Sequence, residues 1–240
     1  MKPTAPIPKK PPPRPAIIRT SLITIFLIAA AVAFAFPWIL QQKKAADQVK
    51  ALSNAGFIGF ALLAFEAEYG RFPDAHTAAE VAKRTGSTLA PPGPSANALL
   101  RQLIAAEMLN FETACYAKTA FTHKPDNKFS TPETALAPGE LGYGYVLDGD
   151  TGLNSGTHHA AILLCAPLAM DGSTVSNMRF DPNPYNSRAV TLRVDLSARS
   201  HPINPRSGEL LINGKPWLTT GEDTIWGTEI TPHVATPEPR

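Results

Sequence analysis

The sequence predicts an α+β fold in which one long N-terminal helix, transmembrane in its first part and soluble in its second, packs on a small antiparallel β-sheet. Three observations predict it. Residues 20–40 contain no charged side chain, and residues 41–69 continue from them without a turn signal. Short segments with strand character follow after residue 140. About 170 residues come after the helix, enough for one domain with its own core.

The chain begins with a proline-rich basic arm, residues 1–19, with five positive side chains and no acidic one. Closely spaced prolines favour polyproline II and exclude a helix, so we expect a disordered arm; a docking motif for a proline-binding partner is the alternative. Because Lys and Arg before a span favour the cytoplasmic side, we expect the arm in the cytoplasm and the C-terminal domain in the periplasm or outside the cell.

Residues 20–40 have the length and composition of a transmembrane helix. Their 21 residues match the ~20 that a helix needs to cross ~30 Å of hydrocarbon, so membrane lipid is an expected partner. A cleavable signal peptide is the rival, since Ala31, Ala33 and Ala35 offer A-x-A patterns. The apolar run continues to Leu40, beyond a usual signal peptide, and this favours a retained single span in the inner (cytoplasmic) membrane.

Residues 41–70 are expected to continue the helix in solution and to carry a one-sided interaction stripe. Its members recur at steps of three and four residues: Val49, Leu52, Gly56, Gly59 and Leu63. Phe57 and Phe60 broaden it. Either the sheet of the same domain covers this stripe, or identical helices do so in a filament. Each glycine costs about 1 kcal/mol relative to alanine inside a helix, so we expect a close approach or a bend there.

The helix is expected to end at the motif Tyr69, Gly70, Phe72 and Pro73. Gly70 suits a left-handed cap, and Pro73 prevents the helix from resuming. The segment ALLAFEAEYGRFPD, residues 61–74, resembles the end of the first helix in type IV pilin-like proteins, especially the pseudopilins of type II secretion systems. The resemblance implies a pilin-like ectodomain at residues 71–230, no enzymatic activity, and other pilin-like subunits or secretion-apparatus proteins as partners.

The start of the helix departs from that family. A pilin is processed after a glycine and bears a glutamate five residues into the helix, whereas this chain has no glycine before Gly56 and no glutamate in residues 20–25. The prepilin peptidase should therefore have no substrate, and the charge pairing with a neighbouring subunit is missing. We expect a permanently anchored, pseudopilin-like structural component of a type II secretion or type IV pilus-type apparatus.

The ectodomain is expected to be loop-rich, since the chain contains 24 prolines. The expected elements are helices at 81–84 and 97–110, an irregular loop at 125–139, and strands at 141–147, 160–165 and 189–196. Asn213-Gly214 is a strong two-residue turn signal and predicts a hairpin of residues 209–212 with 215–218. Residues 231–240 are expected to form a disordered tail.

The chain has two cysteines, Cys115 and Cys165. In an oxidising compartment a pair within one domain is most simply a disulfide, here worth about 4 kcal/mol in the chain-entropy model. Two buried free thiols are the alternative.

Signals for chemistry are few. The formal net charge of +2 and the absence of a basic and aromatic cluster do not favour nucleic acid as a partner. Oxygen ligands recur along one loop as they do in a calcium loop, at Asp148, Asp150 and Asn154. The loop lacks a third early ligand and the closing glutamate of a calcium loop. A solvated turn is therefore favoured, and no cofactor is expected. The alternative function is an anchored periplasmic ectodomain with ligand-binding or metal-dependent hydrolytic activity at this locus.

Overall fold

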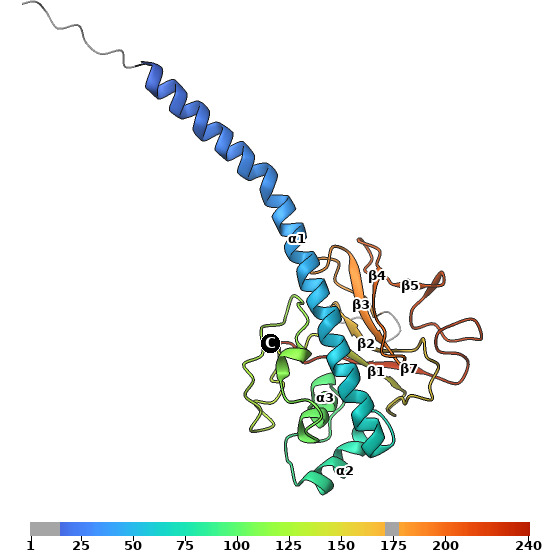
Figure 1. Cartoon of the computed structure of the whole chain (residues 1–240). Coiled ribbons are helices and arrows are strands. Elements are labelled where there is room, and N and C mark those ends of the chain that lie inside the picture. The colour runs from blue at the N-terminus through green and yellow to red at the C-terminus, as the bar shows by residue number, and fades with distance from the viewer. Residues whose placement is uncertain (1–14, 171–177) are drawn as a thin grey trace, which may run out of the picture. The chain divides into compact units, whose positions relative to one another are not determined.

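The structure is a computed structural model, and it describes residues 15–170 and 178–240. The chain divides into two compact units, one ending at Lys43 and the other running from Lys44 to Arg240. The second unit contains the folded domain together with the C-terminal half of the long helix (Figure 1). Its helix and sheet confirm the predicted α+β class.

The long helix α1 spans Pro15–Tyr69. Pro15 suits the first helical position because its missing N–H would have no partner there, so the expected disordered arm is wrong for residues 15–19. Residues 1–14 lie outside the described residues. Within α1, the segment Ala35–Tyr69 is apolar and long enough to cross a membrane, which makes it a candidate membrane span or signal sequence. Part of this segment is buried in the domain.

The predicted end of α1 is confirmed. Gly70 has a φ of 80°, and its N–H donates to the Glu66 carbonyl at 2.7 Å. This left-handed residue closes the last turn as a C-terminal cap. The chain then enters α2 without a long loop, because Asp74 caps the first turn of that helix.

Two further helices and one 3₁₀ turn precede the sheet. They are α2 (Ala75–Thr85), α3 (Ala96–Ala105) and η1 (Glu112–Cys115). The helix expected at residues 97–110 thus ends five residues early, and that expected at residues 81–84 extends further toward the N-terminus. A connection of irregular backbone, residues 116–143, leads from η1 to the first strand.

The main sheet has five antiparallel strands in the order β4-β3-β2-β1-β7. They are β1 (Gly144–Asp148), β2 (Ile162–Ala166), β3 (Arg188–Arg193), β4 (Ala198–Pro202) and β7 (Pro232–Ala235). A separate hairpin joins β5 (Leu211–Ile212) to β6 (Lys215–Pro216). Its turn residues Asn213 and Gly214 have φ values of 53° and 78°, as the Asn-Gly signal predicts.

The expected disordered tail at residues 231–240 is wrong. Residues 232–235 form β7, which pairs with β1 at the edge of the sheet. Beyond it, the Glu238 N–H donates to Asn97 Oδ1 at 2.8 Å, and Ser95 donates to the Glu238 carboxylate. These long-range contacts order a segment whose composition alone favours disorder.

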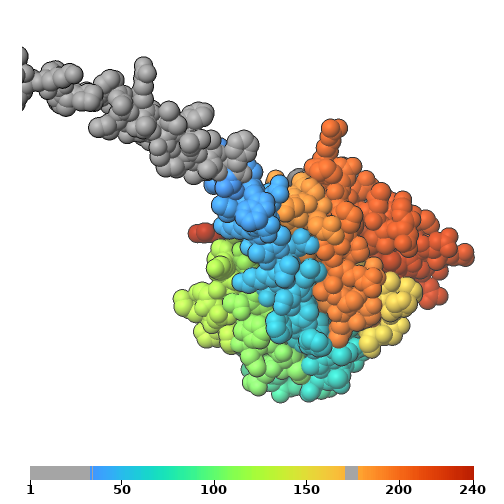
Figure 2. All heavy atoms as spheres, turned by 45° about the horizontal axis from the view of Figure 1, so that its top comes forward, coloured from blue at the N-terminus to red at the C-terminus, as the bar shows by residue number. Residues whose placement is uncertain are grey.

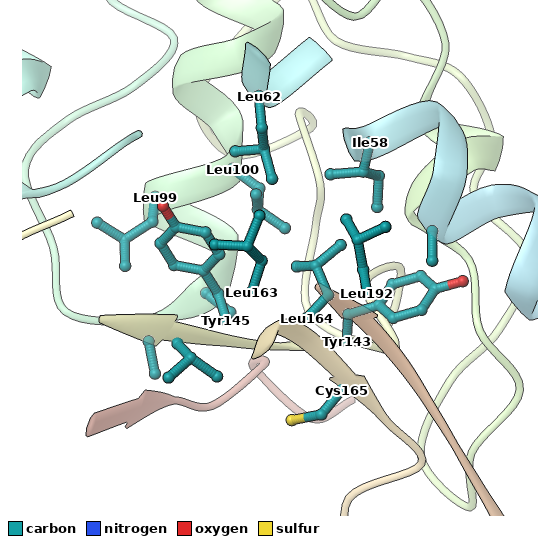
Figure 3. Close-up of a cluster of buried hydrophobic side chains, with 14 of the residues drawn as sticks. Ile58, Leu62, Leu99, Leu100, Tyr143, Tyr145, Leu163, Leu164, Cys165 and Leu192 are labelled. Carbon is teal, nitrogen blue, oxygen red and sulfur yellow. The ribbon is translucent and has the colours of Figure 1, made fainter. Parts of the chain in front are cut away.

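One face of α1 packs on the sheet. Its buried residues recur with a mean spacing close to 3.6: Ala51, Ala55, Ile58, Leu62, Phe65 and Tyr69. Figure 3 shows Ile58 and Leu62 above the strands, with Tyr143 and Leu192 beneath them. The Tyr143 hydroxyl donates to the Ala51 carbonyl at 2.6 Å, so the residue that precedes β1 is bonded directly to α1.

The two cysteines are free and fully buried, so the expected disulfide is not formed. Cys165 pairs with Gly144, and a Cβ on Gly144 would lie 3.2 Å from its sulfur. Its side chain therefore occupies the face of the sheet away from α1 (Figure 3). Cys115 lies on the α1 side, because carbonyls within and next to η1 accept hydrogen bonds from Asn54 of α1.

Candidate functional site

The helix α1 carries no charged side chain from Ala51 to Phe65. A helix that is apolar on all sides is ordinarily surrounded by protein or lipid. The domain covers only one side of this segment, and Figure 2 shows α1 lying along the surface between the chain segments on either side of it. The uncovered side of α1 is therefore the feature of this domain that most needs a partner.

This uncovered side, here called the outward face, consists of four exposed apolar side chains, with the exposed Ser53 between the first and the second. Val49 is 64% exposed, Phe57 49%, Phe60 67% and Leu63 42%. Large side chains at such exposure in one stripe mark an interaction surface in a monomeric domain.

The predicted stripe is divided between the two sides of the helix. Val49, Gly56 and Leu63 belong to the outward face, and Leu52 is half-buried at its edge. Gly59 is buried, and a Cβ on it would lie 3.1 Å from Leu192 of β3, so the expected close approach is confirmed there. At Gly56 the space is open, with nothing within 4 Å.

Aromatic and charged contacts border the outward face. The ring of Phe111 meets that of Phe57 edge to face, with centroids 5.8 Å apart at 79°. Nearer the N-terminus, Lys118 Nζ lies 2.7 Å from Asp47 Oδ2. The face is thus apolar along its middle, and an ion pair borders its N-terminal end.

The helix-end motif docks α1 on the domain. Phe72 is fully buried and donates its N–H to the Leu153 carbonyl at 2.9 Å. Tyr69 stacks on Phe65 with centroids 4.4 Å apart, and the Pro73 carbonyl accepts the Tyr145 hydroxyl at 3.0 Å. In this chain the motif positions the helix and leaves no side chain available for chemistry.

The three residues of the candidate calcium loop make separate local contacts. Asp148 Oδ1 accepts the Thr231 N–H at 2.8 Å, and Asn154 Oδ1 accepts that of Gly156 at 2.9 Å. Asp150 has a side chain that is 96% exposed. The loop therefore brings no ligand set together in this structure.

A different acidic cluster is brought together by the fold. One carboxylate oxygen each from Glu112, Asp126 and Glu140 lies within 4.8 Å of the other two. Burial raises the pKa of Glu112 to about 7; the Leu136 N–H bound to it lowers that pKa, and the nearby carboxylates raise it. Sequence analysis missed this cluster because its members are 14 residues apart in a segment without periodicity.

No protein-family model, curated protein or solved structure matches this chain.

Proposed function

We propose that this chain is a non-enzymatic, membrane-anchored, pilin-like (pseudopilin-like) structural component of a type II secretion or type IV pilus-type apparatus. In this proposal the outward face of α1 binds a helix of another pilin-like subunit or apparatus protein. The observation that carries the proposal is the exposure of Val49, Phe57, Phe60 and Leu63 on one side of a helix that has no charged side chain from Ala51 to Phe65.

The shape of the outward face favours a helical partner. Gly56 has open space around it, with nothing within 4 Å of a Cβ placed there, so a second helix can approach α1 closely at this position. Burying one Val, Leu or Phe side chain completely contributes about 1.5–3 kcal/mol. Four such side chains, even partly buried, supply the driving force for a specific helix contact.

The anchor makes this contact efficient. Partners confined to the same membrane meet at a high effective concentration, so a modest interface suffices for association. The N-terminus is proposed to lie in the cytoplasm and the domain in the periplasm or outside the cell, with the apolar part of α1 retained as a single span.

Cysteine crosslinking of the full chain in its native membrane tests the proposal. Phe60→Cys and Leu63→Cys place a thiol on the outward face, whereas Lys83→Cys places one on the exposed surface of α2. Because Cys115 and Cys165 are fully buried, the wild-type chain provides the background. A short bis-maleimide reagent is expected to give adducts with a second chain from Phe60→Cys and Leu63→Cys alone. Equal yields from Lys83→Cys would contradict a specific helix contact.

A further inference from the structure

Three carboxylates from separate segments meet next to η1. Glu112 belongs to η1, Asp126 to the irregular connection that follows, and Glu140 to the turn before β1. Glu112 and Glu140 are 0% and 3% exposed, whereas Asp126 lies at the surface. The cluster thus has a buried base and an open side through which an ion can enter.

One oxygen of this cluster lacks a partner. Glu112 Oε1 accepts the Leu136 N–H at 2.7 Å, but the buried Oε2 has no hydrogen-bond partner among the described residues. Leaving a buried carboxylate oxygen unpaired is costly, because it has lost water without gaining another donor. The Glu112 carboxylate lies beside two further carboxylates, so a cation is the ligand that would satisfy it.

The local charge matches a divalent ion. The three carboxylates carry three negative charges when ionised, and the exposed Lys128 ammonium, 3.0 Å from Asp126 Oδ2, offsets one of them. His123 Nε2 lies 3.9 Å from Glu140 Oε1. A charge of about −2 remains, which a single divalent cation neutralises.

The donor set selects the kind of cation. It consists of three carboxylates that approach one another closely, and carboxylate oxygens are the ligands that hard cations such as calcium prefer. We propose that Glu112, Asp126 and Glu140 bind one divalent cation of the calcium type. This site is independent of the proposed function.

A bound cation would fasten the long connection between α3 and β1. The Glu140 carboxylate already accepts the N–H groups of Asp126 and Ala137, at 3.1 and 2.8 Å. The ion would add Glu112, and with it η1, to the same junction. Phe111, which precedes Glu112 and packs on Phe57, would be held in place beside the outward face.

Calcium binding by the full chain in detergent tests the site, with calcium alone as the probe. Equilibrium dialysis is expected to find one ion per chain, and about 1 mM calcium in place of a chelator is expected to raise Tm by about 3 °C or more. Glu112→Gln and Asp126→Asn should each weaken binding about tenfold or more, because affinity depends on the charge of the ligand set. Because Asp126 is exposed, Asp126→Asn is expected to fold as the wild type does, so a loss of calcium binding in this variant cannot come from misfolding.

Two control variants locate the site. Glu133→Gln removes an exposed carboxylate of the same connection, and Asp150→Asn removes one from the loop after β1; both should bind calcium as the wild type does. Unchanged binding in Glu112→Gln and Asp126→Asn, or loss of binding in Asp150→Asn alone, overturns the proposal. The proposal is also overturned if calcium does not change the Tm of the wild-type chain and Glu112→Gln has a higher Tm than the wild type. That result would show that the buried Glu112 carboxyl carries a proton in place of a cation.

Discussion

Gly152 lies directly against the carbonyl of Phe72: a Cβ on Gly152 would sit 2.0 Å from that oxygen. Next to this contact, the Gly152 N–H donates to Asp74 Oδ2, and the Phe72 N–H donates to the Leu153 carbonyl. The end of α1 and the cap of α2 are therefore fixed to the segment after β1 through one glycine.

Gly152→Ala is expected to destabilise the domain by about 2 kcal/mol or more, because the new methyl group meets backbone that cannot rotate away. Chemical denaturation of the full chain in detergent measures the loss. Gly56→Ala serves as the matched control, since its Cβ meets nothing within 4 Å. Equal stability of the two variants would show that the helix-end motif is not packed as described.

Gly56→Ala is itself expected to stabilise α1, by up to about 1 kcal/mol, since alanine is the better helix former. At Gly59 the same change should gain less or destabilise, because the side chains of Leu192 and Leu196 stand 3.1–3.3 Å from the new atom. Tm values of the two variants give the comparison. If the outward face binds a helix closely, Gly56→Ala will also reduce crosslinking from Phe60→Cys despite its higher Tm.

Asn54 holds the η1 region to α1. Its Nδ2 donates to the carbonyls of Thr113 and Tyr116, at 2.9 and 2.8 Å. Asn54→Ala leaves both carbonyls without this donor and should cost about 1–3 kcal/mol. Ser53→Ala changes an exposed neighbour on the same helix and should leave the free energy of unfolding within about 0.5 kcal/mol of wild type. Equal denaturation midpoints for Asn54→Ala and Ser53→Ala would argue against the hydrogen bonds from Asn54 to the η1 region.

His201 should make the domain less stable in mild acid. Burial lowers its pKa from the ordinary 6.5, and the nearby Arg193, Arg199 and Arg188 lower it further. Because the unfolded chain then binds the proton more readily than the folded one, stability decreases as the pH falls below about 6.5. Tm measured between pH 7.5 and 5.5 should fall less steeply in His201→Gln. Parallel curves for both proteins would exclude His201 as the cause.

Both thiols should resist alkylation until the domain unfolds. Burial raises the pKa of Cys115 and of Cys165, which keeps both groups as unreactive thiols. Mass spectrometry after non-reducing alkylation is expected to find no adduct on the native chain and two on the denatured chain. A denatured chain that takes up no reagent would show that the sulfurs are bonded after all.

Some elements follow from local sequence. The end of α1 was predictable because Gly70 and Pro73 act within one turn of the helix. The hairpin of β5 and β6 was predictable because Asn213 and Gly214 favour their positive φ values regardless of what lies around them. In β3, alternation of apolar and polar side chains is a local strand signal, but residues 189–192 are all buried, so the one-sided burial that alternation indicates is not found.

Other features depended on partners distant in sequence. Strand β7 was missed because Pro232 and its neighbours have little strand character of their own. They form a strand because they can pair with the edge of β1 that β2 leaves open. The acidic cluster was missed for the same reason: nothing local connects Glu112 to Glu140.

The sequence by itself determined a long apolar helix, its end point and the α+β class, because each of these depends on local composition or on contacts between residues a few positions apart. The tertiary structure decided which side of α1 is covered, since the predicted stripe turned out to be divided between the covered side, with Gly59, and the outward face, with Val49 and Leu63. It also decided that Cys115 and Cys165 are buried as free thiols, and that three carboxylates meet, because folding brings η1 together with two distant parts of the connection that follows it.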